Sequence, residues 1–528
     1  MILSIAGCQK QSLIDPAGGD RATIASGTLY RPDIDIPELF ARVQTEMIFP
    51  DSKTFVDAIP KQPPADIMKL YRVEKERSDF DLKNFVEQHF ELPAPLPVTH
   101  VGNEADMLQH LQGHWVNLLR NPQKTSDYST LIQLPNPYIV PGGRFREMFY
   151  WDSYFTLVGL LQSNQDKLAK DMIDNFAYLI NQVGYIPNGN RTYFLTRSQP
   201  PFFAAMLNLY GQKHGMDSVI QYLPELEKEY AYWMDHQVSI PRKAMSGEHL
   251  VVLDNGDYLN RYYGARDVPR AEAFNKEAKW AQDYGIENKP LFFRNLRAAC
   301  ESGWDFSSRW FADGKNKATI NTMDLIPVDL SSLLYSLEST LAEFQAYKQQ
   351  TARADFYRKR AEQRKAFIQT YHYDAATGTY QDYNFVTRQR TGHLSIAMAF
   401  PLFVNAATAE SARHVARHIK DKLLMPGGVV TTLTASGEQW DYPNGWAPMQ
   451  YITVEGLLQY NEKPLALEIA RRWLTLNERV YREDGKMMEK YNVVDTQLKA
   501  GGGNYPNQDG FGWTNGVDIA FYHLLQQQ

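Results

Sequence analysis

The sequence predicts an all-α protein in which helices form the scaffold and long loops carry the chemistry. Apolar residues recur at spacings of three and four, which is the pattern of a helix with one buried face. Runs of alternating apolar and polar residues, typical of half-buried strands, are few. Loops rich in glycine, proline and asparagine lie between the helical stretches, at residues 141–154, 184–201, 437–448 and 501–516. Periodicity alone does not distinguish a bundle of helices from a ring.

Four stretches show the helical periodicity most clearly. Their apolar positions are Leu108, Leu111, Trp115 and Leu118; Leu168, Met172, Phe176 and Leu179; Leu330, Leu334, Leu337, Leu341 and Phe344; and Leu467, Ala470 and Leu474. Pro464 precedes the last stripe, where the first turn of a helix accepts proline because its N–H groups have no partner within the helix. We expect each stripe to pack against a neighbouring helix.

The first 36 residues differ from the rest of the chain. The sequence begins MILSIAGCQKQS, and residues 5–8 resemble a bacterial lipobox, in which the cysteine receives a lipid. The apolar stretch before Cys8 is shorter than the roughly 7–15 residues of a secretory signal. We expect residues 1–36 to be a signal remnant with a flexible tail and residues 37–528 to form one domain. We also expect a periplasmic location, with a possible lipid anchor at Cys8; a cytoplasmic location is the alternative.

The composition is that of an ordinary globular protein. Of the 528 residues, 44% are hydrophobic and 22% charged, and the net charge of −6 gives no basic excess for binding nucleic acid. No apolar run approaches the ~20 residues that span a bilayer. A disulfide between the two cysteines, Cys8 and Cys300, is not expected, and Cys300 is interpreted as a small buried hydrophobic residue. We expect a monomer.

Residues 141–154, PGGRFREMFYWDSY, concentrate side chains that can bind a sugar. Arg144 offers fixed N–H donors to hydroxyl oxygens, Trp151 offers a flat face, and Asp152 can accept from two adjacent hydroxyl groups. The alternative interpretation is a helix N-terminus with a buried aromatic side chain and a salt bridge. These residues alone leave both interpretations open.

Four segments together resemble the trehalases of glycoside hydrolase family 37. Residues 141–154 are similar to the first signature of that family, and residues 439–448, QWDYPNGWAP, to the second. Residues 50–57, PDSKTFVD, and 508–516, QDGFGWTNG, resemble its N-terminal and C-terminal segments. One short motif can occur by chance, but four in family order are specific. The resemblance implies an (α/α)6 barrel with its active site in the loops at one end. It also implies inverting hydrolysis of trehalose without a cofactor or a metal.

An inverting glycosidase needs two carboxyl groups, one to protonate the leaving oxygen and one to deprotonate water, about 6.5–9.5 Å apart. Asp305 stands between Trp304 and Phe306, and apolar surroundings raise the pKa of a carboxyl group, which suits an acid. Glu489 precedes Lys490, whose charge suits a base if the two side chains point the same way. Because the chain has 61 acidic residues, local context does not select the pair. The resemblance implies Asp305 as the acid and Glu489 as the base.

The resemblance also implies a set of substrate-binding positions. These are Arg144, Phe145, Trp151, Asp152, Asn188, Arg197, Ser198, Gln199, Arg270, Ala271, Glu272, Gly303 and Asn504. Two depart from the family pattern, which has proline at position 271 and glutamate at position 504. Asn504 keeps an acceptor oxygen but loses the charge, so we expect changed affinity or subsite preference. Glycines 501–503 suit a loop that closes over the pocket.

Two other functions are compatible with the same features. Another inverting glycosidase on this barrel, such as a glucoamylase-like enzyme, would need a longer cleft for polysaccharide chains. An inactive sugar-binding lipoprotein is the second alternative, and the presence of both Asp305 and Glu489 argues against it.

Two histidine pairs, His110 with His114 and His414 with His418, have the spacing of metal ligands on a helix. Neither stands in an HExxH pattern or near a cysteine cluster. We therefore expect both pairs on helix surfaces and no metal site.

Overall fold

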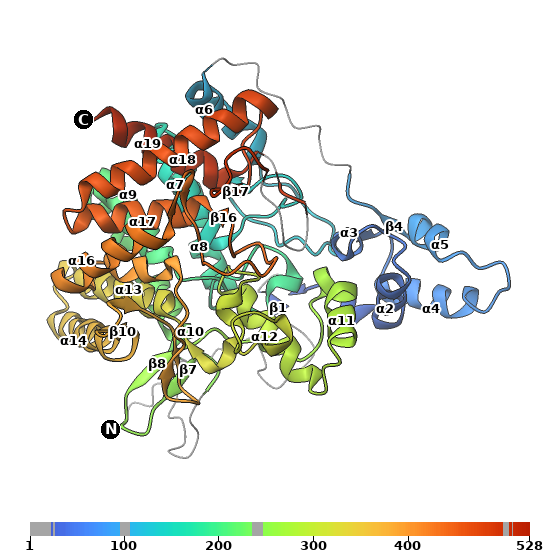
Figure 1. The fold of residues 1–528 in the computed structure, drawn as a ribbon. Helices are drawn as coiled ribbons and strands as arrows, with labels where there is room; N and C mark the ends of the chain where they lie inside the picture. The colour runs from blue at the N-terminus through green and yellow to red at the C-terminus, as the bar shows by residue number, and fades with distance from the viewer. Residues whose placement is uncertain are drawn as a thin grey trace, which may run out of the picture.

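The computed structural model describes residues 23–24, 27–94, 106–234, 247–499, 506–508 and 510–527. Helices dominate these ranges, and the strands are only two or three residues long (Figure 1). The predicted all-α class is therefore confirmed. Cys8, Asn504 and the glycines at 501–503, for which the sequence predicted an anchor, a sugar contact and a closing loop, lie outside the described residues.

Six helices form a closed ring at the centre of the main body. They are α7 (Tyr150–Gln162), α9 (Phe203–His214), α13 (Val328–Tyr347), α15 (Phe400–Phe403), α17 (Ala447–Gln459) and α19 (Gly512–Gln526). Each helix contacts the next in this order, and α19 returns to contact α7. The ring is therefore closed by the first and the last of its helices.

A second layer of helices covers this ring. Its members are α6 (Met107–Leu118), α8 (Asp166–Val183), α10 (Leu223–Trp233), α14 (Thr351–Phe367), α16 (Ala409–His418) and α18 (Lys463–Asp484). All but α16 make extensive contacts with inner helices, and α16 follows α15 in the alternation of inner and outer helices. The molecule is therefore an (α/α)6 barrel, as the family resemblance implied.

The four stretches with helical periodicity are α6, α8, α13 and α18, and Pro464 lies in the first turn of α18. Three of the predicted loops end too late in the sequence. Their last residues belong to helices, because α7 begins within residues 141–154, α17 within 437–448 and α19 within 501–516. Every residue of α7 except the last is buried. A helix surrounded by protein has no polar face, so periodicity does not reveal where it begins.

The expectation of surface histidines was wrong for one pair. His110 and His114 lie on the buried face of α6. The ring of His110 lies 4.8 Å from that of Tyr481 in α18, and His114 lies next to Gly510. The reason is that α6 packs against α19 and the loop before it, which makes this face an interior one.

A smaller helical unit projects from the barrel (Figure 1). It contains α2 (Pro37–Glu46), α3 (Ser52–Val56), α4 (Pro64–Glu74) and α5 (Leu82–His89), which pack around their own hydrophobic cluster. Phe149, Tyr193 and Phe194 of the barrel belong to the same cluster. The unit is therefore docked onto the end of the barrel where α7 and α9 begin.

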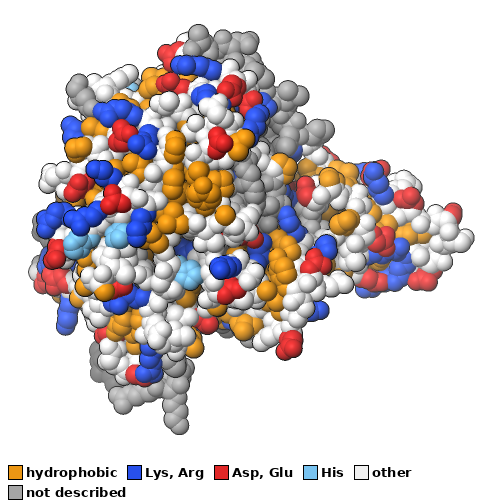
Figure 2. All heavy atoms as spheres, viewed as in Figure 1, with side chains coloured by type: hydrophobic (Ala, Val, Ile, Leu, Met, Phe, Trp, Pro, Cys, Tyr) orange, Lys and Arg blue, Asp and Glu red, His pale blue; other side chains and the backbone are white. Residues whose placement is uncertain are grey.

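The surface mixes both signs of charge. On the face viewed in Figure 2, acidic and basic side chains are interspersed over the barrel and the projecting unit alike. Among the described residues, no helix combines the length and the apolar character that crossing a membrane requires.

Candidate active site

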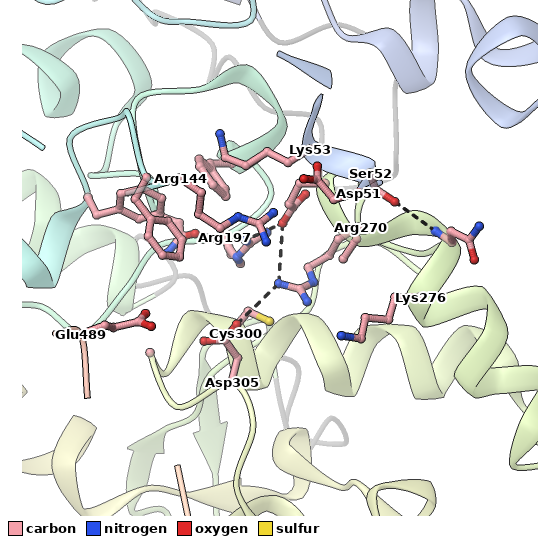
Figure 3. A pocket seen from close by; sticks show the side chains of 18 of the residues that line it. Asp51, Ser52, Lys53, Arg144, Arg197, Arg270, Lys276, Cys300, Asp305 and Glu489 are labelled. Atoms are coloured by element: carbon pink, nitrogen blue, oxygen red, sulfur yellow. Dashed lines mark hydrogen bonds and ion pairs between the residues drawn. The ribbon is translucent and has the colours of Figure 1, made fainter. Parts of the chain in front are cut away.

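A cavity of about 420 Å³ lies at the end of the barrel where the inner helices begin. Its walls come from the loops that precede α7, α9, α13, α17 and α19, while α2, α3 and α11 (Phe274–Asp283) form its mouth. The predicted site residues that line it are Arg144, Phe145, Trp151, Asp152, Asn188, Arg197, Gln199, Arg270, Glu272, Gly303, Asp305 and Glu489. Residues spread over most of the chain therefore meet in one place (Figure 3).

Two predicted binding residues lie behind this lining. The Ser198 hydroxyl donates to the Ile186 carbonyl oxygen at 2.6 Å, and the Ser198 N–H donates to Glu301 at 2.9 Å. Ala271 is buried in the hydrophobic cluster of the projecting unit. Both residues therefore shape the loops that carry their neighbours.

Asp305 reaches the cavity from the loop that follows α12 (Lys289–Glu301). The flanking Trp304 and Phe306 are fully buried. Burial raises the pKa of Asp305 to about 6, while Arg270 and Arg197 oppose this rise. About a third of the side chain, 31%, stays open to the cavity. Asp305 can therefore keep its proton up to a pH of about 6, well above an ordinary aspartate, and present it to a ligand, as a general acid does.

Gly303 allows this loop to pass beneath Trp151. Its φ of +78° lies in the left-handed region, and a Cβ added there would stand 2.7 Å from Trp151 Cε2. Both the backbone angle and the close approach therefore favour glycine at this position.

Glu489 enters the cavity from the loop between α18 and α19. Its backbone N–H donates to the Gln508 carbonyl oxygen at 2.9 Å, and its carbonyl oxygen accepts from Trp513 Nε1 at 3.0 Å. Glu489 Oε2 lies 3.3 Å from Lys490 Nζ, so the two side chains point the same way, as the sequence interpretation required. Figure 3 shows the carboxyl groups of Asp305 and Glu489 extending into the same space from two sides.

A third carboxyl group, that of Asp152, lies in the first turn of α7. Burial raises the pKa of Asp152 well above its usual range, and the charges of Glu489 and Asp305 add to the rise. A protonated carboxyl group can donate one hydrogen bond as well as accept, which suits a ligand hydroxyl group. Gln199 holds the start of this helix, because its side-chain oxygen accepts from the Trp151 N–H at 3.1 Å.

Arg197 and Arg270 bracket Glu272 beside these carboxyl groups. Glu272 Oε1 lies 2.9 Å from Arg197 Nη2 and 3.6 Å from Arg270 Nη1. Burial alone would raise the pKa of Glu272, but Arg197, Arg270, a backbone hydrogen bond and Arg297 together lower it. Arg270 Nη1 is also 3.9 Å from Asp305 Oδ2. Two N–H groups of Arg197 are buried without a hydrogen-bond partner among the described protein atoms, so ligand oxygens can satisfy them.

Arg144 and Cys300 complete this side of the cavity. Figure 3 shows the Arg144 side chain extending toward Arg197. The Arg144 N–H donates to Gln508 Oε1 at 2.8 Å, which joins the segment 141–154 to the C-terminal segment 508–516. Cys300 is 3% exposed, as expected for a small buried residue, and burial raises the pKa of its thiol.

Stacked tryptophans form the apolar wall. The rings of Trp440 and Trp446 lie 3.9 Å apart and nearly parallel, and Trp304 stacks on Trp440 at 5.3 Å. Trp440, Trp446 and Trp513 line the cavity together with Trp151. Of these four, sequence reasoning gave a role to Trp151 alone, although Trp440, Trp446 and Trp513 stand in the recognised segments 439–448 and 508–516.

The residues at the mouth were missed altogether. Phe49 precedes α3, and Lys276 and Trp280 belong to α11. Phe49 stands just before one recognised segment, and no local pattern marks Lys276 or Trp280. The docking of the projecting unit brings Phe49 to the cavity, and the packing of α11 against α2 and α12 brings Lys276 and Trp280.

Comparison with known proteins gives a consistent result. The chain matches the family model for trehalase over residues 47–526. It is 44% identical to a periplasmic trehalase of Pseudomonas aeruginosa over 526 residues, which are 99% of this chain and 96% of that protein. It is 44% identical to a periplasmic trehalase of Citrobacter koseri over 496 residues, 94% of this chain and 86% of that protein.

Solved structures show the same fold. The neutral trehalase Nth1 from Saccharomyces cerevisiae superposes with a TM-score of 0.61 at 28% identity, over 73% of each chain. A GH63 mannosylglycerate hydrolase from Thermus thermophilus superposes with a TM-score of 0.51 over 78% of this chain and 100% of that chain. At 14% identity, the second similarity concerns the fold alone.

Proposed function

Because the chain belongs to the trehalase family, we propose that it hydrolyses α,α-trehalose to two glucose molecules with inversion at the attacked carbon. One observation carries the chemistry: Asp305, with its raised pKa, and Glu489, beside an ammonium group, share one cavity. Inverting hydrolysis requires such a pair, one carboxyl group protonated and the other ionised.

In the proposed reaction Asp305 gives its proton to the oxygen that joins the two glucose rings. Glu489 takes a proton from a water molecule, which attacks the anomeric carbon from the opposite face. The bond from that carbon to the bridging oxygen breaks as the bond to the water oxygen forms. One glucose leaves with its configuration retained and the other with it inverted. Exchange with solvent then returns a proton to Asp305 and removes one from Glu489.

The remaining lining supports binding of a small polyhydroxylated ligand. Arg144, Arg197 and Arg270 supply donors for hydroxyl oxygens, and Asp152 supplies a group that can donate and accept. Tryptophan faces such as that of Trp446 suit the apolar side of a sugar ring. A cavity of about 420 Å³ is of the size that encloses a small molecule, which favours a disaccharide over a polysaccharide chain.

The names of two similar proteins support a cellular location for this chain. The proteins from Pseudomonas aeruginosa and Citrobacter koseri are named periplasmic trehalases, and we assign this chain to the periplasm on that similarity. A lipid anchor at Cys8 and a monomeric state are further proposals that rest on the sequence. We also propose that residues 37–528 act as one domain, because α2 and α3 contribute residues to the mouth of the cavity.

Glucose release from trehalose, maltose and starch tests this function. We expect glucose release from trehalose alone. NMR spectra recorded before mutarotation should show that one of the two glucose molecules is released as the β-anomer. Comparable release from maltose or starch would favour the glucoamylase-like alternative. Calorimetric binding of trehalose without any release would favour the inactive sugar-binding alternative.

A further inference from the structure

The side chain of Gln439 joins the loop of Asp305 to the loop of Glu489. Gln439 Nε2 donates to the backbone carbonyl oxygen of Asp305 at 2.6 Å. On its other side, Gln439 Oε1 accepts from Lys490 Nζ at 3.3 Å, and the same ammonium group donates to Glu489 Oε2 at 3.3 Å. Three hydrogen bonds therefore run from the backbone of one carboxyl-bearing residue to the carboxylate of the other.

This bridge is held firmly at its acid end. The Trp440 N–H donates to the Phe306 carbonyl oxygen at 3.1 Å. Asp441 accepts from the Ser307 hydroxyl at 2.8 Å and from the Ser308 N–H at 2.7 Å. The three residues from Gln439 onward thus follow the backbone of the Asp305 loop residue by residue, and that loop cannot shift without them.

The base end is equally confined. Gln439 and Lys490 are each 1% exposed. Lys490 Nζ lies 5.2 Å from the centre of the Trp446 ring, and Trp446 Nε1 donates to the Gln439 carbonyl oxygen at 3.0 Å. Asn507 Nδ2 donates to the Lys490 carbonyl oxygen at 3.0 Å. The buried amide of Gln439 donates to the Asp305 loop and accepts from the Glu489 loop, and these two hydrogen bonds fix the separation of the loops.

We infer that Gln439 is a positioning residue that sets the acid loop relative to the base, with Lys490 as the link to Glu489. The inference rests on the proposed function, because it takes Asp305 as the acid and Glu489 as the base. The inverting mechanism depends on a separation that admits one water molecule. A displacement of about 1 Å in such a site costs roughly 100-fold in rate.

Two substrates distinguish an effect on the acid loop from an effect on the base. Trehalose needs both the acid and the base. α-Glucosyl fluoride needs the base but little protonation, because fluoride leaves readily as an anion. Gln439→Met removes the hydrogen bonds to Asp305 and Lys490. Lys490→Met removes the hydrogen bonds to Gln439 and Glu489 but keeps the one from Gln439 to the Asp305 backbone.

We expect Gln439→Met to lower kcat on trehalose about 10- to 100-fold, with little change in KM and a much smaller loss on α-glucosyl fluoride. Lys490→Met should slow both substrates to a similar extent. Gln381→Met is the matched control, because Gln381 is buried and bonds Thr379 and Gly392 outside the cavity. That variant should keep the wild-type ratio of the two rates.

An unchanged ratio of the two rates in Gln439→Met overturns the inference. A loss of folded protein lowers both rates together and leaves the ratio unchanged, so the ratio isolates positioning. Should Gln439→Met fail to fold, Gln439→Asn carries the same test, because its shorter amide cannot reach both loops. If the wild-type protein releases no glucose from trehalose, the proposed function itself fails. If the wild type is active, Asp305→Asn is inactive and Gln439→Met keeps the wild-type ratio, only the bridge is refuted.

Discussion

Asp305 and Glu489 differ in their neighbours, and this difference underlies their proposed roles. Buried tryptophan and phenylalanine flank Asp305, whereas an ammonium group lies beside Glu489. Asp305→Asn and Glu489→Gln keep the shapes of the side chains but cannot transfer the proton. We expect each to lower kcat on trehalose by about 10²–10⁴-fold without changing the midpoint of thermal unfolding. Asp355→Asn, at an exposed pair on α14, should keep full activity. Steady-state kinetics on trehalose measure this loss of kcat. A near-normal rate in Glu489→Gln would rule out that residue as the base.

The pH dependence of the reaction also belongs to single residues. As the proposed acid, Asp305 would act only when protonated, so kcat/KM should fall as the pH rises through its pKa of about 6. Arg270, 3.9 Å away, holds that pKa down by favouring the carboxylate. In Arg270→Met the limb of the profile that falls with rising pH should move to higher pH, and loss of the proposed sugar contact should lower the rate at every pH. A profile of kcat/KM against pH for the wild type and the variant gives the pH at which the rate falls in each. A limb that moves to lower pH would contradict the assignment of Asp305 as the acid.

At the scale of elements, a buried ionic network docks the projecting unit onto the barrel. Lys53 Nζ in α3 lies 2.5 Å from Asp57 Oδ2 and 2.8 Å from Glu147 Oε1 of the loop before α7. Arg191 Nε is 2.9 Å from Glu147 Oε1, and the Tyr193 hydroxyl donates to Asp57 at 2.8 Å. Two cations thus face two carboxylates. Because Lys53 itself lines the cavity, the network couples the docking of this unit to the shape of the mouth.

Lys53→Met would leave Asp57 and Glu147 with one cation between them. Removing one partner of a buried ion pair costs about 3–5 kcal/mol, and the loss here falls on the contact between the two units. We expect faster hydrogen exchange in α2 and α3 and a higher KM for trehalose. Lys69→Met breaks an exposed pair with Asp66 in α4, worth about 0–1 kcal/mol, and is the control. Equal exchange rates in the two variants would show that the network does not hold the unit in place.

Elements also show where sequence reasoning succeeds. Periodicity identified α8 and α18 because one face of each is exposed and the other buried. It missed the starts of α7 and α19, which are buried on all sides. The motifs located part of the cavity lining, since three of them lie at the start of an inner helix and residues 50–57 include α3 at the mouth. They did not reveal that Ser198 turns away from the cavity, or that Trp280 reaches it, because both depend on packing between distant segments.

At the scale of the whole molecule, the ring depends on the seam between α7 and α19, which come from opposite ends of the barrel sequence. Gly159 and Gly516 face each other across this seam, and a Cβ added to Gly159 would lie 2.4 Å from Gly516 Cα. The start of α7 carries Asp152, and Trp513 in α19 holds the backbone of Glu489. The closeness of the two helices therefore sets both the closure of the barrel and the width of the cavity.

Gly516→Ala tests this closure. The added Cβ would stand 2.1 Å from the Phe155 carbonyl oxygen of α7, which forces the two helices apart. Overpacking of this kind costs about 1–3 kcal/mol, more than the roughly 0.5–1 kcal/mol that alanine gains over glycine in an open helix. We expect a lower midpoint of thermal unfolding together with a lower kcat, because the seam positions both sides of the cavity. Gly113→Ala in α6 is the matched control: no atom lies within 4 Å of its added Cβ, so its midpoint should stay or rise. Equal midpoints for the two variants would mean that close glycine packing does not hold the barrel shut.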